Sequence, residues 1–162
     1  MTPDTDNVVR AAYMPPAQRQ DWETPFALFD QIERNLIERF DQRFVLDVCA
    51  TKQNAKCRRF YTADSLSRSW ASADGFWWCN PPYGRGIDRW VQKGVTEGGG
   101  VLLLPARTDT RWFHDWLWTN DSTTTGVEVR FVRGRVRFVG SAASAPFPSM
   151  VVMVHHHESE TC

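Results

Sequence analysis

The residues with the clearest capacity for chemistry are Asn80-Pro81-Pro82-Tyr83, which directly follow the aromatic run Trp77-Trp78-Cys79. Proline lacks an N–H and fixes φ, so two prolines in succession end a strand and stiffen the loop that carries Asn80 and Tyr83. The Asn80 side-chain oxygen and the Pro81 carbonyl can each accept an N–H from one amino group. Tyr83 can stack on the ring that bears this group, a contact worth roughly 1–3 kcal/mol for a nucleobase. These residue types indicate a site for an exocyclic amine on a flat ring; the plainer alternative is a proline-rich turn.

An amine held by two acceptors becomes more reactive. The two hydrogen bonds draw its nitrogen toward tetrahedral geometry and localise the lone pair, which makes the nitrogen a nucleophile. A base in a duplex must be flipped out to reach such a loop, at a cost of a few kcal/mol. Gly84-x-Gly86 follows the loop and lacks the third glycine of a nucleotide fingerprint, so we interpret it as part of the same target-base loop.

The elements that must position this loop can be predicted from apolar runs and spacings. Strands are predicted at 44–50, 60–62, 75–79, 101–105 and 147–154, and helices at 25–40, 86–96 and 109–118. Their alternation predicts an α/β fold with an open, mostly parallel sheet. Residues 127–139 alternate Val or Phe with Arg around Gly134, which predicts a hairpin that adds antiparallel strands at one edge. Ligands of such sheets bind at the carboxyl ends of strands, where the 80–83 loop is expected.

Length and composition limit the class of protein. The chain has 162 residues with 19 basic and 19 acidic side chains, so it is not a polycation that coats nucleic acid. We expect a flexible arm at 1–20, a single domain at 21–154 and a tail at 155–162. No run of about 18 apolar residues and no secretory signal pattern is present, so no membrane partner is expected. The four cysteines form no C-x-x-C pair, and reduced thiols suit the cytoplasm.

The histidines do not indicate a metal site. His155, His156 and His157 resemble a ligand cluster, but their position near a polar terminus favours a frayed tail. His114 is expected on the helix at 109–118, without other ligands near it. We therefore expect no bound metal.

The chain resembles a known family beyond its central motif. Asn80-Pro81-Pro82-Tyr83 is similar to the catalytic motif of amino-methyltransferases that use S-adenosylmethionine, and more of the chain resembles the phage-type DNA N6-adenine methyltransferases. The further matching segments are Trp22 with Thr24-Pro25, 46–50, 54–56, 61–62, Trp70, 78–84, 103–107 with Trp112, and 145–150. The resemblance implies a phage or prophage protein of the bacterial cytoplasm, with a Rossmann-like methyltransferase sheet and helices on both faces. It also implies that Asn80 and Pro81 orient the N6 amine of adenine in DNA beside Pro82, while Tyr83 stacks the base.

The methyl donor is expected at the end of the first strand. No glycine-rich loop follows Asp47, although Cys49 and Ala50 are small enough to let a ligand approach the backbone. Asp47 can accept from the donor's amino group or position a water molecule. Asp64 lies 17 positions later, near the offset at which an acid binds ribose hydroxyls, and its alternative role is a helix cap. Only 33 positions separate Asp47 from Asn80, so we expect a trimmed methyltransferase sheet.

Trp22, Thr24 and Pro25 complete the predicted donor site by resemblance. Thr24-Pro25 is similar to a Thr-Pro element that packs beside the methionine end of the donor in related enzymes. The plainer interpretation is that Thr24 and Pro25 begin the following helix, and both roles are compatible.

Arginines near the motif are candidates for DNA contacts, because the chain has no room for a separate recognition domain. The candidates are Arg85, Arg89, Arg107, Arg130, Arg133, Arg135 and Arg137. For Arg107 the alternative is an internal salt bridge, and for the last four it is a solvated face of a β-ribbon.

Other functions stay open at the level of sequence. The same amine chemistry serves RNA adenine, cytosine N4 or a protein amide, although Asn before the prolines favours adenine by resemblance. A non-catalytic single-strand binder would use the eight tryptophans and the arginines. No Pro-Cys pair stands at the loop, which argues against carbon-5 methylation of cytosine. The sequence leaves the oligomeric state undetermined.

Overall fold

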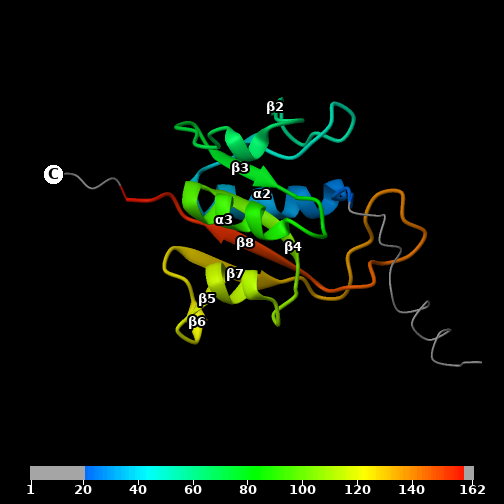
Figure 1. Cartoon of the computed structure of the whole chain (residues 1–162). Coiled ribbons are helices and arrows are strands. Elements are labelled where there is room, and N and C mark those ends of the chain that lie inside the picture. Colours follow the sequence, from blue (N-terminus) through cyan, green and yellow to red (C-terminus); the bar gives the residue numbers. More distant parts are fainter. Residues whose placement is uncertain (1–20, 159–162) are drawn as a thin grey trace, which may run out of the picture.

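A mixed six-stranded sheet forms the centre of the computed structural model, which describes residues 21–158 (Figure 1). Its strand order is β2-β1-β3-β4-β8-β7. The bounds are β1 Phe44–Asp47, β2 Arg59–Phe60, β3 Phe76–Cys79, β4 Gly100–Pro105, β7 Val127–Phe131 and β8 Ser149–Val154. The first four strands of the order are parallel, whereas β8 runs antiparallel to both β4 and β7. The predicted α/β fold with a mostly parallel sheet is confirmed, while the predicted arm at 1–20 lies outside the described residues.

Two helices cover opposite faces of the sheet (Figure 1). They are α2, Phe26–Phe40, and α3, Ile87–Glu97. Successive strand residues point to opposite faces, so the neighbours Trp77 and Trp78 of β3 separate. Trp78 meets Phe29 of α2 edge-on at 5.2 Å between ring centroids. Trp77 lies on the α3 side, where its ring closely approaches Gly94.

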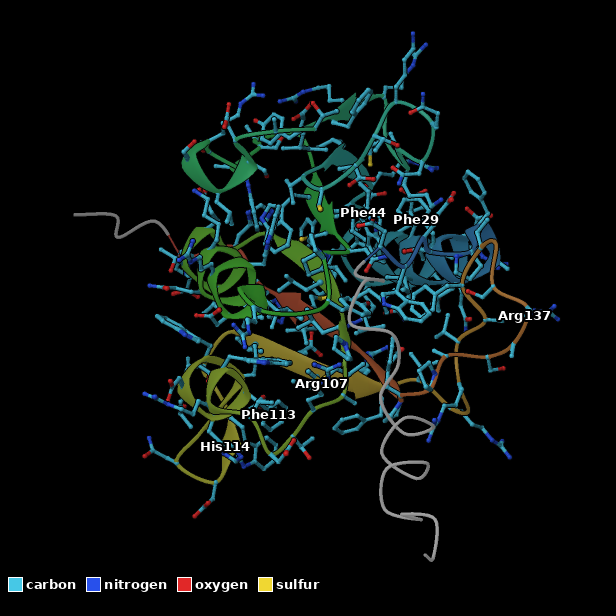
Figure 2. The ribbon with its side chains drawn as sticks, turned by 45° about the vertical axis from the view of Figure 1, so that its right-hand side comes forward. Phe29, Phe44, Arg107, Phe113, His114 and Arg137 are labelled. Carbon is cyan, nitrogen blue, oxygen red and sulfur yellow. The ribbon has the colours of Figure 1, made fainter. Side chains whose placement is uncertain are left out.

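The core is built largely from these aromatic rings. Trp70, Trp77 and Trp78 are fully buried, and the indole N–H of Trp77 donates to the Gly98 carbonyl at 2.7 Å. The Trp77 ring packs so closely on Gly100 that a Cβ added there would lie 1.9 Å from ring carbon Cδ2. Phe29 and Phe44 pack together on the α2 side at 5.2 Å (Figure 2). Most of the tryptophan content therefore serves packing.

The connections between β1 and β3 lack the α-helix of a regular βαβ unit. Between them the structure has only β2 and the three-residue helix η1, Ser65–Ser67. The chain therefore leaves the carboxyl end of β1 as a loop, residues 48–58, rather than as a helix. This loop curls back to the end of β1, where the Lys56 N–H donates to the Asp47 carboxylate at 3.0 Å.

The helix predicted at 109–118 is shorter than expected. The helical run spans 111–117, of which η2, Phe113–Leu117, is a π-helix, and a small hairpin follows with β5, Trp118–Thr119, and β6, Ser122–Thr123. Asn120 and Asp121 between them both have positive φ, 53° and 59°. Two such residues form the tight turn that matches the twist of a hairpin, so residues 118–119 pair with 122–123 instead of continuing the helix. None of the described helices has the length and apolar character that a bilayer span requires.

The hairpin predicted at 127–139 is wrong in its second arm. Residues 127–131 form β7, but β7 pairs with β8, and residues 132–148 form an irregular loop. The continuous apolar strand β8 offers β7 a six-residue partner that can be buried. Arg135 and Arg137 remain exposed, whereas Val136 and Phe138 turn inward and pack on the core. In residues 135–138, the alternation of Arg with Val or Phe therefore belongs to a loop whose apolar side chains are buried in the core.

Candidate functional site

A cavity of about 420 Å³ lies at the carboxyl ends of β1 and β3. Asp47 ends β1 and Asn80 follows β3, and because the two strands are parallel neighbours their ends meet. Pro81 and Pro82 form another part of the wall. The cavity therefore combines the predicted loop with the predicted donor site. Its lining residues are Asp21, Trp22, Glu23, Thr24, Asp47, Cys49, Ala50, Thr51, Asn54, Lys56, Thr62, Trp78, Asn80, Pro81, Pro82 and Val139.

The Asn80 amide is held in one orientation. Its Nδ2 donates to the Trp22 carbonyl and, at 3.0 Å, to the Thr24 hydroxyl. A carbonyl oxygen can only accept, so turning the amide over would set two acceptors against each other. The other end of the amide, Oδ1, is buried and has no hydrogen-bond partner among residues 21–158. An orphaned acceptor of this kind costs about 1–3 kcal/mol until a donor reaches it.

The Asp47 carboxylate is buried and held by the backbone of the loop after β1. It accepts the main-chain N–H of Cys49 at 3.2 Å and that of Lys56 at 3.0 Å. Burial raises the pKa of Asp47 to about 6, opposed by these two hydrogen bonds and by the charge of Lys56. The group is therefore mostly ionised at neutral pH and gains a proton in mildly acidic solution.

Cys49 is not a nucleophile at neutral pH. Burial, followed by the negative charges of Asp47 and Asp21, raises the pKa of the Cys49 thiol to about 12. The reactive form of cysteine is the thiolate, so this thiol acts as a small wall residue. Within the described residues, the wall of the cavity therefore contains no activated cysteine.

Lys56 is a wall residue that sequence patterns alone did not single out as functional. Its side chain is 3% exposed, and its ammonium lies 3.5 Å from a Glu23 carboxylate oxygen. It also lies 4.2 Å from the ring centroid of Phe26. With Asp21, Glu23 and Asp47 against Lys56 alone, the ionisable groups of the wall are predominantly acidic.

The predicted donor residues are only partly brought together. Trp22, Thr24, Asp47, Cys49 and Ala50 line the cavity, as expected for a site at the end of β1. Pro25 stands just behind the wall, where its carbonyl accepts the N–H groups of Leu28 and Phe29 as α2 begins.

Asp64 does not line the cavity. It is exposed, has a φ of 56° and precedes η1, and the wall at this side is formed by Thr62. Sequence spacing also missed Asp21, Glu23, Thr51, Asn54, Thr62, Trp78 and Val139. These residues lie on separate loops and strands, and no spacing rule connects them.

Tyr83 lies in the core rather than in the cavity wall. It is 4% exposed, and its hydroxyl donates to the Leu103 carbonyl at 2.9 Å. Phe147 and Phe138 contact its ring edge-on. Burial raises the pKa of Tyr83 well above its ordinary value, so the hydroxyl stays a neutral donor. In this arrangement Tyr83 anchors the loop, and its stacking role stays a prediction.

The arginines nearest the motif gather at a second cavity of about 450 Å³. Arg85 and Arg107 line it, and Arg111, which sequence reasoning did not select, joins them beside Trp112 and Trp116. Asp88 and Asp115 also contribute to the wall. Arg107 makes no salt bridge with any carboxylate in the described part of the chain, so its predicted internal ion pair is not seen. Arg89 is exposed on α3 and lies outside this cavity.

The four arginines at 130–137 do not form one stripe. Arg130 donates to the Asn35 side chain at 3.2 Å, and Arg133 lines a groove between α2 and β7. Arg135 and Arg137 donate to main-chain carbonyls of their own loop. Figure 2 shows Arg137 at the outer end of this loop, away from Arg107. The DNA-binding role of this group stays a prediction.

The first residues of the predicted tail make defined contacts. His155 N–H donates to the Gly126 carbonyl at 2.9 Å, and its ring lies 2.9 Å from Glu128. The His157 ring bonds the Thr96 carbonyl at 2.9 Å. The frayed tail expected from the sequence therefore does not describe 155–157. Across residues 21–158 no three His, Cys, Asp or Glu side chains are grouped as metal ligands.

Comparisons with known proteins agree on one family. A family model described as DNA N-6-adenine-methyltransferase (Dam) matches residues 12–161. The chain is 30% identical over 104 residues to a DNA N-6-adenine-methyltransferase of Escherichia phage T1, covering 61% of this chain and 41% of that protein. It is 31% identical over 98 residues to one of Haemophilus phage HP1 (strain HP1c1), covering 57% of this chain and 53% of that protein.

The matched region spans about half of each curated relative or less, and no solved structure matches. The family model, however, extends over nearly the whole chain, from the segment before the cavity to the last strand and beyond. The chain belongs to the DNA N-6-adenine-methyltransferase (Dam) family.

Proposed function

We propose that this protein transfers a methyl group from S-adenosylmethionine to the N6 amine of adenine in DNA. The observation that carries the proposal is the Asn80 amide, whose oxygen is a buried acceptor without a donor, next to Pro81 at the edge of a cavity. Membership of the Dam family supports the same reaction. We further propose that the sheet is a trimmed form of the Rossmann-like methyltransferase sheet, with β1 and β3 carrying the site.

The charge of the cavity supports a cationic donor. Asp21, Glu23 and Asp47 outnumber Lys56, and a predominantly acidic wall repels the phosphates of a nucleotide cofactor. S-adenosylmethionine would supply a methyl group bound to a sulfonium sulfur, and this sulfur is a good leaving group. Asp47, ionised above about pH 6, accepts from the donor's amino group, while Cys49 and Ala50 leave room beside it.

The acceptor amine is oriented by the loop after β3. Asn80 Oδ1 and the Pro81 carbonyl would each accept one N–H, which leaves the nitrogen lone pair available for the methyl group. With S-adenosylmethionine bound, its sulfonium methyl group would pass to this nitrogen, the sulfur would leave as a neutral thioether, and the amine would lose one proton to solvent. Correct placement supplies most of the rate acceleration, and no strong base is needed. Pro82 stiffens the loop, and Tyr83 either stacks the base after a ring movement or holds the loop from below.

DNA is proposed to lie across the carboxyl edge of the sheet. The arginine cavity begins at Gly84, directly after Tyr83, and Arg107 follows β4, the neighbour of β3. A flipped adenine at Asn80 would therefore place an adjoining phosphate near Arg85, Arg107 and Arg111. Contacts of this kind hold a strand in register without reading its sequence.

The alternative of a non-catalytic single-strand binder is disfavoured by burial. All eight tryptophans lie in the described residues, and Trp118 alone is exposed, at 37%. Stacking platforms for successive bases need exposed ring faces. The tryptophans of this chain are mostly committed to the core.

The proposal is tested with purified protein, labelled S-adenosylmethionine, and separate DNA, RNA and protein acceptors. The expected result is label in DNA alone, recovered as N6-methyladenine after nuclease digestion. Label in RNA, in protein or at cytosine N4 would replace the substrate assignment. Calorimetry with S-adenosylmethionine distinguishes a methyltransferase from a protein that only binds nucleic acid, because the latter gives no heat with the donor.

A further inference from the structure

The short segment 21–25 connects the parts of the cavity that are far apart in the chain. Its Trp22 carbonyl and Thr24 hydroxyl accept from Asn80, and the Glu23 carbonyl accepts the Val139 N–H at 3.0 Å. The Glu23 carboxylate meets the Lys56 ammonium at 3.5 Å. The 21–25 segment therefore contacts the motif loop, the loop after β1 and the loop 132–148 at once.

These contacts address a weakness of asparagine as an acceptor. Rotation about its last side-chain bond exchanges oxygen and nitrogen, and the two orientations present opposite chemistry to a substrate. With Nδ2 in the place of Oδ1, an amine that approached this position would meet another N–H donor. The Trp22 carbonyl opposes that orientation because it can only accept, and the Thr24 hydroxyl adds a second acceptor for Nδ2.

Burial makes the Thr24 contact difficult to replace. Thr24 is 2% exposed, so water is largely excluded from the space around its hydroxyl. A net hydrogen bond in such a place is worth about 0.5–1.5 kcal/mol. Thr24 also precedes Pro25, whose carbonyl begins the hydrogen bonding of α2, so its backbone is held by the helix start.

We propose that Thr24 is a positioning residue, which acts with the Trp22 carbonyl to fix the Asn80 amide so that its oxygen is the group offered to the substrate amine. This inference rests on the proposed function and differs from the donor contact that sequence resemblance predicts for Thr24. A positioning role affects the rate of transfer, because correct orientation of the amine matters most as its nitrogen becomes tetrahedral. A donor-contact role would affect the affinity for S-adenosylmethionine.

The test compares Thr24→Val, which keeps the shape and removes the hydroxyl, with Thr24→Ser, which restores the hydroxyl. We expect Thr24→Val to lower kcat about tenfold, in line with the removal of one hydrogen bond of about 1.4 kcal/mol, with the Kd of S-adenosylmethionine changed less than about twofold. Thr24→Ser should recover most of kcat. The control is Thr96→Val on the exposed face of α3, which should behave as wild type.

A second readout does not depend on activity. In nuclear magnetic resonance spectra, the side-chain NH2 protons of Asn80 should be protected from exchange in the wild type and should lose protection in Thr24→Val. An unchanged Asn80 signal, or an unchanged kcat with a raised donor Kd, overturns the proposal. If Thr24→Val does not fold, Thr24→Ala and the wild-type exchange rate decide the same question, since an unprotected NH2 in the wild type also overturns it. If the wild type methylates no acceptor, the proposed function fails, while the Asn80 signal still reports on the hydrogen bond itself.

Discussion

At the scale of single residues, main-chain atoms contact three polar side chains in and beside the motif. The Trp22 carbonyl holds Asn80, two backbone N–H groups hold Asp47, and the Leu103 carbonyl holds Tyr83. A backbone partner is fixed by the fold, whereas a side-chain partner can change rotamer. The site is therefore preorganised by the ends of strands, which is the arrangement that catalysis by positioning requires.

Replacing the amide of Asn80 tests its role directly. Asn80→Ala removes the orphaned acceptor and should abolish methyl transfer, a decrease of at least about 10³-fold, because the amine is left with one of its two orienting bonds. Donor binding measured by calorimetry should survive. Asn35→Ala on α2 serves as the control, since the Asn35 side chain bonds Arg130 and takes no part in the cavity wall. Transfer by Asn80→Ala at the wild-type rate would refute the assignment.

Protonation of Asp47 should weaken donor binding in mildly acidic solution. Its pKa is raised to about 6, so the carboxylate that we propose accepts from the donor's amino group is ionised above this pH and becomes protonated below it. The affinity for S-adenosylmethionine should therefore fall as the pH is lowered through the pKa, approaching about tenfold per pH unit below it. Calorimetry from neutral to mildly acidic buffer measures the effect. Asp47→Asn should bind weakly with little pH dependence; a slope equal to that of the wild type would assign the titration to another group.

At the scale of elements, β3 organises the molecule because its two central tryptophans support both helices. Trp78 packs on α2 and Trp77 on the α3 side, and the same strand leads into Asn80. A shift of β3 along the sheet would move the motif with it. The position of the chemistry therefore depends on how closely Trp77 packs on β4.

Substitution at Gly100 should show this dependence. A Cβ at Gly100 would lie 1.9 Å from the Trp77 ring, too close for either strand to keep its place. Gly100→Ala should lower the free energy of unfolding by about 1–3 kcal/mol or more, measured by urea denaturation. The control Gln92→Ala on the exposed side of α3 should change it by less than about 0.5 kcal/mol. Equal midpoints for the two variants would contradict the packing described.

Elements with continuous apolar runs were predictable, while those decided by partners were not. The runs at β1, β3, β4 and β8 have no other place than a sheet interior, and each forms a strand within or beside its predicted range. Residues 133–137 alternate arginine with other residues in the same way as a strand. They form a loop because β8 is already paired on both sides, with β4 and β7.

At the scale of the whole molecule, the carboxyl edge of the sheet combines two cavities of different charge. The first is mainly acidic, and the second has three arginines and two aspartates. Under the proposed function, this division would keep a cationic donor and an anionic strand apart, although both cavities adjoin the 80–83 loop. The net charge of the chain, which is zero, does not reveal this difference in charge between the two cavities.

The salt dependence of DNA binding should show whether the DNA backbone lies at the arginine cavity. Arg107→Gln and Arg111→Gln should each weaken binding, and each should reduce the slope of log K against log salt by about 1, because each variant neutralises one phosphate fewer. Fluorescence anisotropy with a labelled oligonucleotide at several salt concentrations measures both. Arg43→Gln is the matched control, because Arg43 precedes β1 at the opposite edge of the sheet. The same change of slope in all three variants would exclude a specific role for the arginine cavity.

The sequence by itself determined the α/β class, the strands β1, β3, β4 and β8 and the loop that carries Asn80, because apolar runs and prolines act locally. Only the tertiary structure decided which groups meet there. Thr24 and Asn80 are 56 positions apart, and no local pattern connects them. Tyr83 could also point either way after two prolines; its ring turned inward because Phe138 and Phe147, from a distant loop, form an apolar pocket that a ring fills better than water.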